Sequence, residues 1–131
     1  MIILSINPKE YPKGSDVIEL PNKILLPGLM DMHTHLDIDF TGGFDHFITK
    51  ENASKGAIRA AKNAEKTLMA GFTTVRDLGG SGVNIALRNA INKGIVEGPR
   101  IFTSGKAIGT TGGHADPTNG LNQKIICDAV V

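Results

Sequence analysis

The stretch "KILLPGLMDMHTHL", from Lys23 to Leu36, is an apolar run that is interrupted by Pro27 and Gly28 and ends in two histidines, His33 and His35. Its apolar residues follow one another instead of alternating with polar ones. Such continuity is typical of a strand buried on both faces, as in a parallel sheet, rather than a strand half exposed to water. We therefore expect a doubly buried strand here.

Downstream of this strand, apolar residues repeat at helical spacing in two segments, and a glycine stands at the end of each, where a helix C′ glycine is expected. Compact stretches rich in β-branched residues follow each segment and are typical of strands. The expected elements are a strand over Lys23–Leu36, a helix over Ala53–Ala70, a strand over Phe72–Gly80, a helix through Ala86–Ile91 up to Gly94, and a strand over Pro99–Gly105. This order predicts an α/β fold with parallel strands and right-handed crossovers.

Two shorter strands are predicted upstream of the long apolar run. They are "MIILSI" (Met1–Ile6) and "DVIELP" (Asp16–Pro21), and a loop rich in proline, lysine, glycine and serine separates them.

Composition excludes several classes of partner. The chain has 131 residues, with 14 basic and 13 acidic side chains and a net charge of +1, so no strong field favours nucleic acid or an anionic membrane. Its one cysteine, Cys127, excludes an internal disulfide framework and fits a reducing compartment. No apolar run approaches the roughly 20 residues of a membrane helix, and the start lacks a signal-peptide pattern. We expect a soluble, cytoplasmic protein.

The two histidines predict a metal site. Side chains two residues apart on a strand point to the same face, so His33 and His35 present their imidazoles side by side while Thr34 points away. Neutral imidazole is a zinc ligand, although zinc takes at least three protein groups. A chance pair is the alternative, but two unpartnered imidazoles at the end of a buried strand would carry a desolvation cost. We predict that His46, in a loop-like segment, is a surface residue rather than a third ligand.

Unusual sequence follows each strand of the α/β part: "DMHTHLD", then "RDLGG", then "SGKAIGTTGGHAD". Ligand sites of parallel α/β proteins lie at the carboxyl ends of the strands, so these segments mark the expected site. For "RDLGG" a structural role is an equal alternative, in which Asp77 caps the next segment or pairs with Arg76.

The blocks "LLPGLMDMHTHLD", "AGFTTVRDLGG", "GPRIFTSGKAIGTTGGHAD" and "ICD" together resemble the metal-dependent amidohydrolase superfamily, in particular its imidazolonepropionase-like and Xaa-Pro dipeptidase-like branch. The resemblance implies a distorted (β/α)₈ barrel beside a small β-sandwich, with a mono- or binuclear metal centre that hydrolyses amide or ester bonds by metal-activated water. On this resemblance His33 and His35 are metal ligands. It also puts His114 near the substrate; the alternative is that His114 is a solvated loop residue.

The resemblance also implies groups that this chain lacks. A bridging lysine of a fourth strand, histidines of the fifth and sixth strands and an aspartate of the eighth would complete the site, and Lys124 precedes the fourth strand and is no substitute. We therefore expect a partial TIM-like barrel of about three βα units over residues 27–131 and a remnant of the β-sandwich over residues 1–26. We expect no catalytic residue in this chain, which is interpreted as a fragment that is inactive alone.

Three hypotheses about function follow. The first is a hydrolase of amide bonds in dipeptides or cyclic amides, with one or two divalent metals per full-length subunit; zinc is the first choice, and manganese, iron and nickel stay open. The second is a catalytically inactive relative that serves as a binding or assembly module, and the third is a small metal-binding or structural domain. For the first, Asp31 or Asp37 could orient a ligand histidine, although we expect Asp37 to solvate the strand end. The expected partners are a small-molecule or dipeptide substrate, no nucleic acid and no membrane, and a homo-oligomer of the full-length protein stays open.

Overall fold

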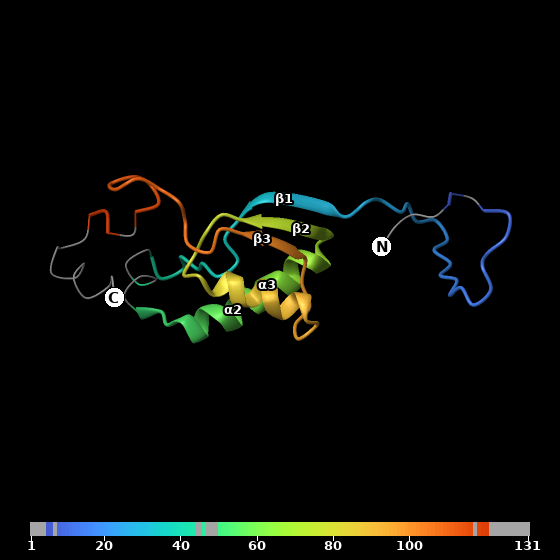
Figure 1. Cartoon of the computed structure of the whole chain (residues 1–131), viewed down its shortest axis with the longest axis horizontal. Coiled ribbons are helices and arrows are strands. Elements are labelled where there is room, and N and C mark those ends of the chain that lie inside the picture. Colours follow the sequence, from blue (N-terminus) through green and yellow to red (C-terminus); the bar gives the residue numbers. More distant parts are fainter. Residues whose placement is uncertain (1–4, 7, 44–45, 47–49, 117, 121–131) are drawn as a thin grey trace.

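The computed structural model of the chain describes residues 5–6, 8–43, 46, 50–116 and 118–120. In this described part three strands alternate with two helices: β1 (Leu29–Thr34), α2 (Ala53–Met69), β2 (Phe72–Asp77), α3 (Val83–Asn92) and β3 (Arg100–Thr103). The strands form one sheet in the order β1-β2-β3, and both pairs are parallel (Figure 1). The predicted order of elements and the parallel sheet are therefore confirmed. The arrangement is compatible with part of a TIM-like barrel.

Helix α2 begins and ends where its sequence predicts. The side chain of Asn52 accepts a hydrogen bond from the backbone N–H of Lys55 at 2.9 Å and so caps the first turn. Gly71 follows the last turn with a φ of +97°, a conformation that favours glycine. The buried positions of this helix are Gly56, Ala60 and Ala64. Gly56 lies next to Val83 of the second helix, and the two alanines belong to the core.

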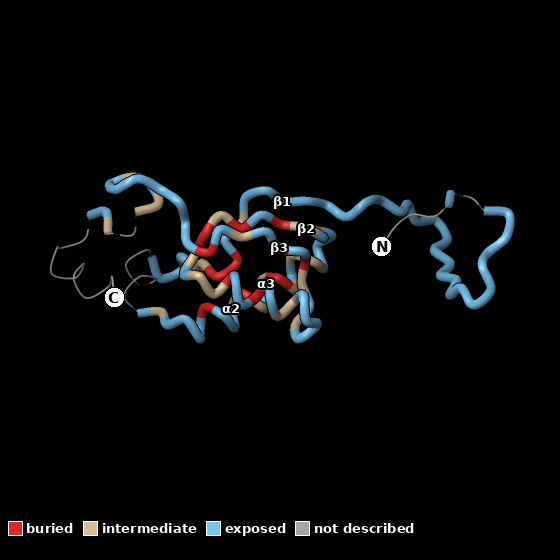
Figure 2. The backbone as a smooth tube through the Cα atoms, viewed as in Figure 1, coloured by how far each residue is buried: buried red, intermediate tan, exposed pale blue. Residues whose placement is uncertain are grey.

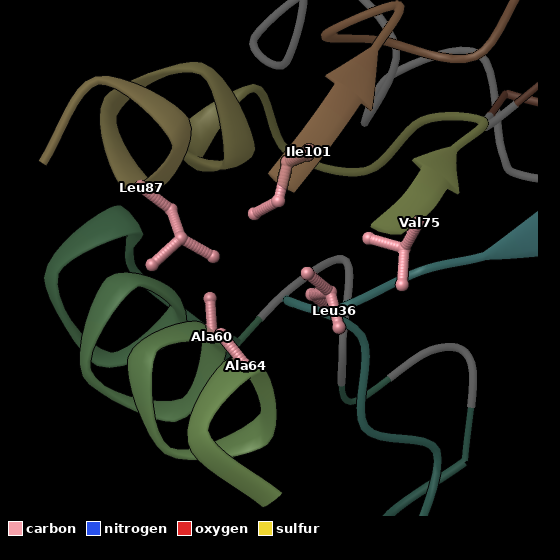
Figure 3. Close-up of a cluster of buried hydrophobic side chains, with 6 residues drawn as sticks. All are labelled: Leu36, Ala60, Ala64, Val75, Leu87 and Ile101. Atoms are coloured by element: carbon pink, nitrogen blue, oxygen red, sulfur yellow. The ribbon is translucent and has the colours of Figure 1, made fainter. Parts of the chain in front are cut away.

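The core lies between the sheet and the two helices, which cover one face of the sheet only (Figure 1). Its buried apolar side chains come from every layer; they are Leu36, Ala60, Ala64, Val75, Leu87 and Ile101 (Figure 3). Phe102 alternates with the buried Ile101 along β3, so it faces the other side of the sheet, and it is 59% exposed. The uncovered face of the sheet is thus partly apolar.

The prediction that the first strand is buried on both faces is wrong for this structure. Leu29 is 52% exposed and Met30 is 68% exposed. The reason is that β1 pairs with β2 on one side only, and among the described residues no element packs on the uncovered face. A continuous apolar run predicts a strand that is buried when other elements pack on both of its faces, but the run does not show whether those elements are present.

The predicted strand at Asp16–Pro21 is not formed, and the described residues before β1 are exposed throughout (Figure 2). A strand needs a paired neighbour, and none is present for this segment among the described residues. Most of the strand predicted at Met1–Ile6 lies outside the described residues. The sandwich remnant over residues 1–26 and its boundary with the barrel therefore stay predictions. Neither described helix has the length and apolar character needed to cross a membrane.

Candidate metal centre

A bulge in β1 sets the position of the histidines. Asp31 pairs with Val75 and Thr34 pairs with Asp77, so β1 advances three residues while β2 advances two. The Oδ1 atom of Asp31 accepts the backbone N–H of His33 at 3.0 Å, which satisfies a donor inside the bulge. Bulges re-aim side chains near sites, and this one contains His33 and ends directly before His35. Asp31 thus supports the backbone of His33.

The imidazoles of His33 and His35 lie side by side, as predicted. Their Nε2 atoms are 3.3 Å apart, and the ring centroids are 5.2 Å apart with an interplanar angle of 71°. Two nitrogens bound at zinc's usual distance in a tetrahedral site are separated by about 3.3–3.4 Å. The spacing therefore fits two ligands of one tetrahedral ion. Whether they bind metal stays a prediction.

The other ring nitrogen of His35 is fixed by Gly79, a residue that the sequence reasoning did not single out. Nδ1 of His35 lies 2.7 Å from the carbonyl oxygen of Gly79. A carbonyl only accepts, so Nδ1 carries the proton and Nε2 presents its lone pair. This is the orientation that a metal-binding histidine needs. The signal in the sequence was the glycine pair of "RDLGG".

Asp77 has neither of the roles weighed for it, and it is fully buried. Its carboxylate accepts hydrogen bonds from the backbone N–H of Leu36 at 2.9 Å and of Gly79 at 3.2 Å, and from Nδ2 of Asn84 at 2.6 Å. Helix α3 is capped by Gly82 without a side-chain bond, and the Nε atom of Arg76 donates to the carbonyl of Met32. Asp77 therefore joins the ends of β1 and β2.

The prediction that Asp37 solvates the strand end is also wrong, because this side chain is fully buried. Its Oδ2 atom accepts from the N–H and the hydroxyl of Ser81, at 2.7 and 2.6 Å. Its carbonyl oxygen accepts from Arg59 on α2 at 2.6 and 3.0 Å. Among the described contacts, none joins the carboxylate of Asp37 or Asp31 to an imidazole ring.

The described residues contain no group of three or more His, Cys, Asp or Glu side chains that could hold a metal ion. His46 is exposed, as predicted for a surface residue. His114 is exposed on the loop after β3, and no described contact joins it to the histidine pair. Lys124 and Cys127 lie outside the described residues. The structure thus brings two imidazole nitrogens together and supplies no third candidate ligand from its described part.

A charge cluster connects α2 to the end of β1. The guanidinium of Arg59 forms an ion pair with Glu51, and Lys55 pairs with the same carboxylate at 2.9 Å. The hydrogen bond from Arg59, followed by that from Lys55, lowers the pKa of Glu51 from 4.5 to about 2. Because Arg59 also donates to the carbonyl of Asp37, the cluster braces the residue two places after His35.

We expect the Glu51→Gln variant to lose less stability in acid than the parent chain. The depressed pKa of Glu51 means that its contribution is fully present above pH 4.5 and is lost as the pH falls toward about 2. Urea unfolding followed by circular dichroism would give the free energy of unfolding at each pH between 5 and 2.5. Glu65→Gln, which removes an exposed partner of Lys62, is the control and should retain the parental slope. If the free energy of unfolding of Glu51→Gln falls with pH as steeply as that of the parent chain, Glu51 does not make this contribution.

Comparison with known proteins agrees with the geometry. The model of the amidohydrolase family matches residues 24–129. Ochratoxinase of Aspergillus niger is 39% identical over 112 residues, which are 83% of this chain and 22% of that protein. A crystal structure of a Xaa-Pro dipeptidase with methionine bound in its active site is 50% identical with a TM-score of 0.65, over 75% of this chain and 24% of that one.

A second crystal structure, of a prolidase complexed with N-methylphosphonate-L-proline, is 36% identical with a TM-score of 0.60 over 77% of this chain and 26% of that chain. This chain thus spans about a quarter of the length of the relatives it matches. The matched residues contain all three strands and the histidine pair. The chain belongs to the amidohydrolase family.

Proposed function

We propose that this chain provides the first two ligands of a divalent-metal centre that hydrolyses amide bonds. The observation that carries the proposal is the 3.3 Å spacing between the Nε2 atoms of His33 and His35, together with the bond that keeps the proton of His35 on Nδ1. The hydrolases among its relatives support the reaction class. Zinc is the first choice, because nitrogen ligands at this spacing suit a tetrahedral ion.

The residues of this chain prepare the site for the ion. Gly79 holds the ring of His35 through its carbonyl, and Asp31 holds the bulge that carries His33. A bound divalent cation would supply the chemistry, by lowering the pKa of a water molecule and polarising the scissile carbonyl. At least one further protein ligand is required, and the proposal assigns it to residues beyond the described part of this chain.

The proposed substrates are small peptide-like amides, with dipeptides first and cyclic amides second. Support comes from the relatives named as a Xaa-Pro dipeptidase and a prolidase, which are 50% and 36% identical to this chain. We propose that His114, on the loop that follows β3, lies near the substrate. Parallel α/β proteins bind ligands at this end of the strands.

A graft tests the proposed function. Residues 24–129 of this chain would replace the matching segment of the Xaa-Pro dipeptidase, and hydrolysis of Xaa-Pro dipeptides would be measured with added Zn²⁺ or Mn²⁺. We expect the graft to hydrolyse its substrate, and the graft with His33→Gln to lose activity because one ligand is missing. The graft with His46→Gln is the matched control and should stay active. A graft that folds and binds metal but does not hydrolyse would favour a catalytically inactive binding module.

A further inference from the structure

We propose that Asp77 is a positioning residue for His35, which sets the direction of the imidazole and the nitrogen that carries its proton. Asp77 does not touch the ring. It acts on the backbone at both sides of it, through Leu36 and Gly79. That this positioning serves metal binding rests on the proposed function. The positioning itself is a property of the metal-free chain.

The first connection runs through the backbone that follows His35. The Oδ2 atom of Asp77 accepts the N–H of Leu36 at 2.9 Å. Leu36 is itself in the core, with 5% of its surface exposed. The peptide group between His35 and Leu36 is therefore held at its nitrogen by a buried carboxylate, and the Cα of His35 has little freedom to rotate.

The second connection runs through the carbonyl that the ring of His35 contacts. The Oδ1 atom of Asp77 accepts the N–H of Gly79 at 3.2 Å, and the carbonyl oxygen of Gly79 accepts Nδ1–H of His35 at 2.7 Å. These three hydrogen bonds, together with the peptide bond between His35 and Leu36, form a closed loop through Asp77 and Gly79. A shift of the carboxylate moves both the backbone of His35 and the acceptor of its ring proton.

Asn84 fixes the carboxylate in place. Its Nδ2 group donates to Oδ1 of Asp77 at 2.6 Å and to the carbonyl of Gly105 at 3.1 Å. Both Asp77 and Asn84 are fully buried, so water does not compete for these bonds. Because Asn84 belongs to α3 and Gly105 follows β3, the network joins the ends of all three strands.

Only a carboxylate meets the demands at position 77. Three donors from Leu36, Gly79 and Asn84 converge on its two oxygens. An ionised Asp is an acceptor at both oxygens, whereas Asn has the same shape but presents an NH₂ group on one side. Asp77→Asn therefore sets a donor against a donor on one side of the closed loop, with almost no change in volume.

The test is nitrogen-15 NMR of the histidine rings in the metal-free chain, at a pH at which the imidazoles are neutral. In the parent chain His35 should be protonated at Nδ1, which bonds to the Gly79 carbonyl. No such ring bond is described for His46 or His114, which should favour Nε2–H, the tautomer that free imidazole side chains prefer. In Asp77→Asn the Nδ1–H form of His35 should cease to be the major species. Asn84→Ser, which removes one donor to Asp77, should shift His35 in the same direction by less.

Ala64→Gly is the control for general loss of stability, because it weakens the buried face of α2 without touching the network; its His35 tautomer should match the parent. An unchanged tautomer in folded Asp77→Asn overturns the proposal. If that variant does not fold, Asn84→Ser decides the question in its place, and an Nε2–H form of His35 in the parent overturns the proposal outright. Zn²⁺ titration of the parent chain is read separately, so a failure of the metal site does not obscure the positioning result.

Discussion

Replacing His35 with glutamine is expected to abolish measurable binding of Zn²⁺ or Co²⁺ by the chain. The described structure brings only two candidate nitrogen ligands together, at 3.3 Å, so the variant leaves one. Loss of an outer-shell partner alone costs about 10–100-fold in metal affinity, and loss of a direct ligand costs more. Isothermal titration of the chain with Zn²⁺, or the visible absorption of bound Co²⁺, measures the affinity.

His46→Gln is the matched control for this experiment. It removes an exposed imidazole from the same part of the chain and should leave the affinity at the parental value. The same affinity in His35→Gln and in the parent chain would show that the metal binds elsewhere. Such a result would remove the basis of the proposed function.

Substituting Gly79 with alanine is expected to unfold much of the chain. The φ of Gly79 is +135°, and an added Cβ would lie 2.4 Å from the backbone nitrogen of Ala107, which cannot move aside as a flexible side chain could. Backbone strain and overpacking each cost about 1–3 kcal/mol, or about 2–6 kcal/mol together. With only six buried apolar residues in the described core, the chain has little stability to lose. Urea unfolding followed by circular dichroism measures the change.

Gly94→Ala separates the steric effect from the conformational one. Gly94 also has a positive φ, +69°, but nothing lies within 4 Å of its added Cβ. This variant should therefore lose only the roughly 1–2 kcal/mol of the left-handed conformation. Equal losses in Gly79→Ala and Gly94→Ala would show that the contact with Ala107 does not constrain the loop after β2.

The order of elements could be predicted because it depends on local signals. The spacing of apolar residues in α2 and the glycine at position 71 are features of adjacent sequence, and the predicted helix over Ala53–Ala70 differs from the observed one by a single residue. The burial of β1 could not be predicted in this way. It depends on what packs against the strand, and an apolar run carries no information about whether that cover is present.

The geometry of the candidate site could likewise be predicted only where it depends on neighbouring residues. The spacing of the two histidines predicted that His33 and His35 lie side by side, and they do. Their placement also depends on the bulge in β1 and on the end of this strand at Thr34. The acceptor for His35 lies 44 residues away in sequence, at Gly79, and the partner of the Leu36 N–H lies 41 residues away, at Asp77. Both meet β1 only because the strands are parallel and end at one edge. Sequence marked "RDLGG" as a site segment but left the role of Asp77 open.

X-ray absorption spectroscopy at the zinc edge, on the chain loaded with one equivalent of Zn²⁺, identifies the atoms that bind the ion. We expect two imidazole nitrogens at about 2.0–2.1 Å, with oxygen ligands completing the shell, and the loss of this signature in the double variant of His33 and His35. A shell made of oxygen alone, or an imidazole signal that survives in the double variant, would contradict the claim that these two histidines hold the metal.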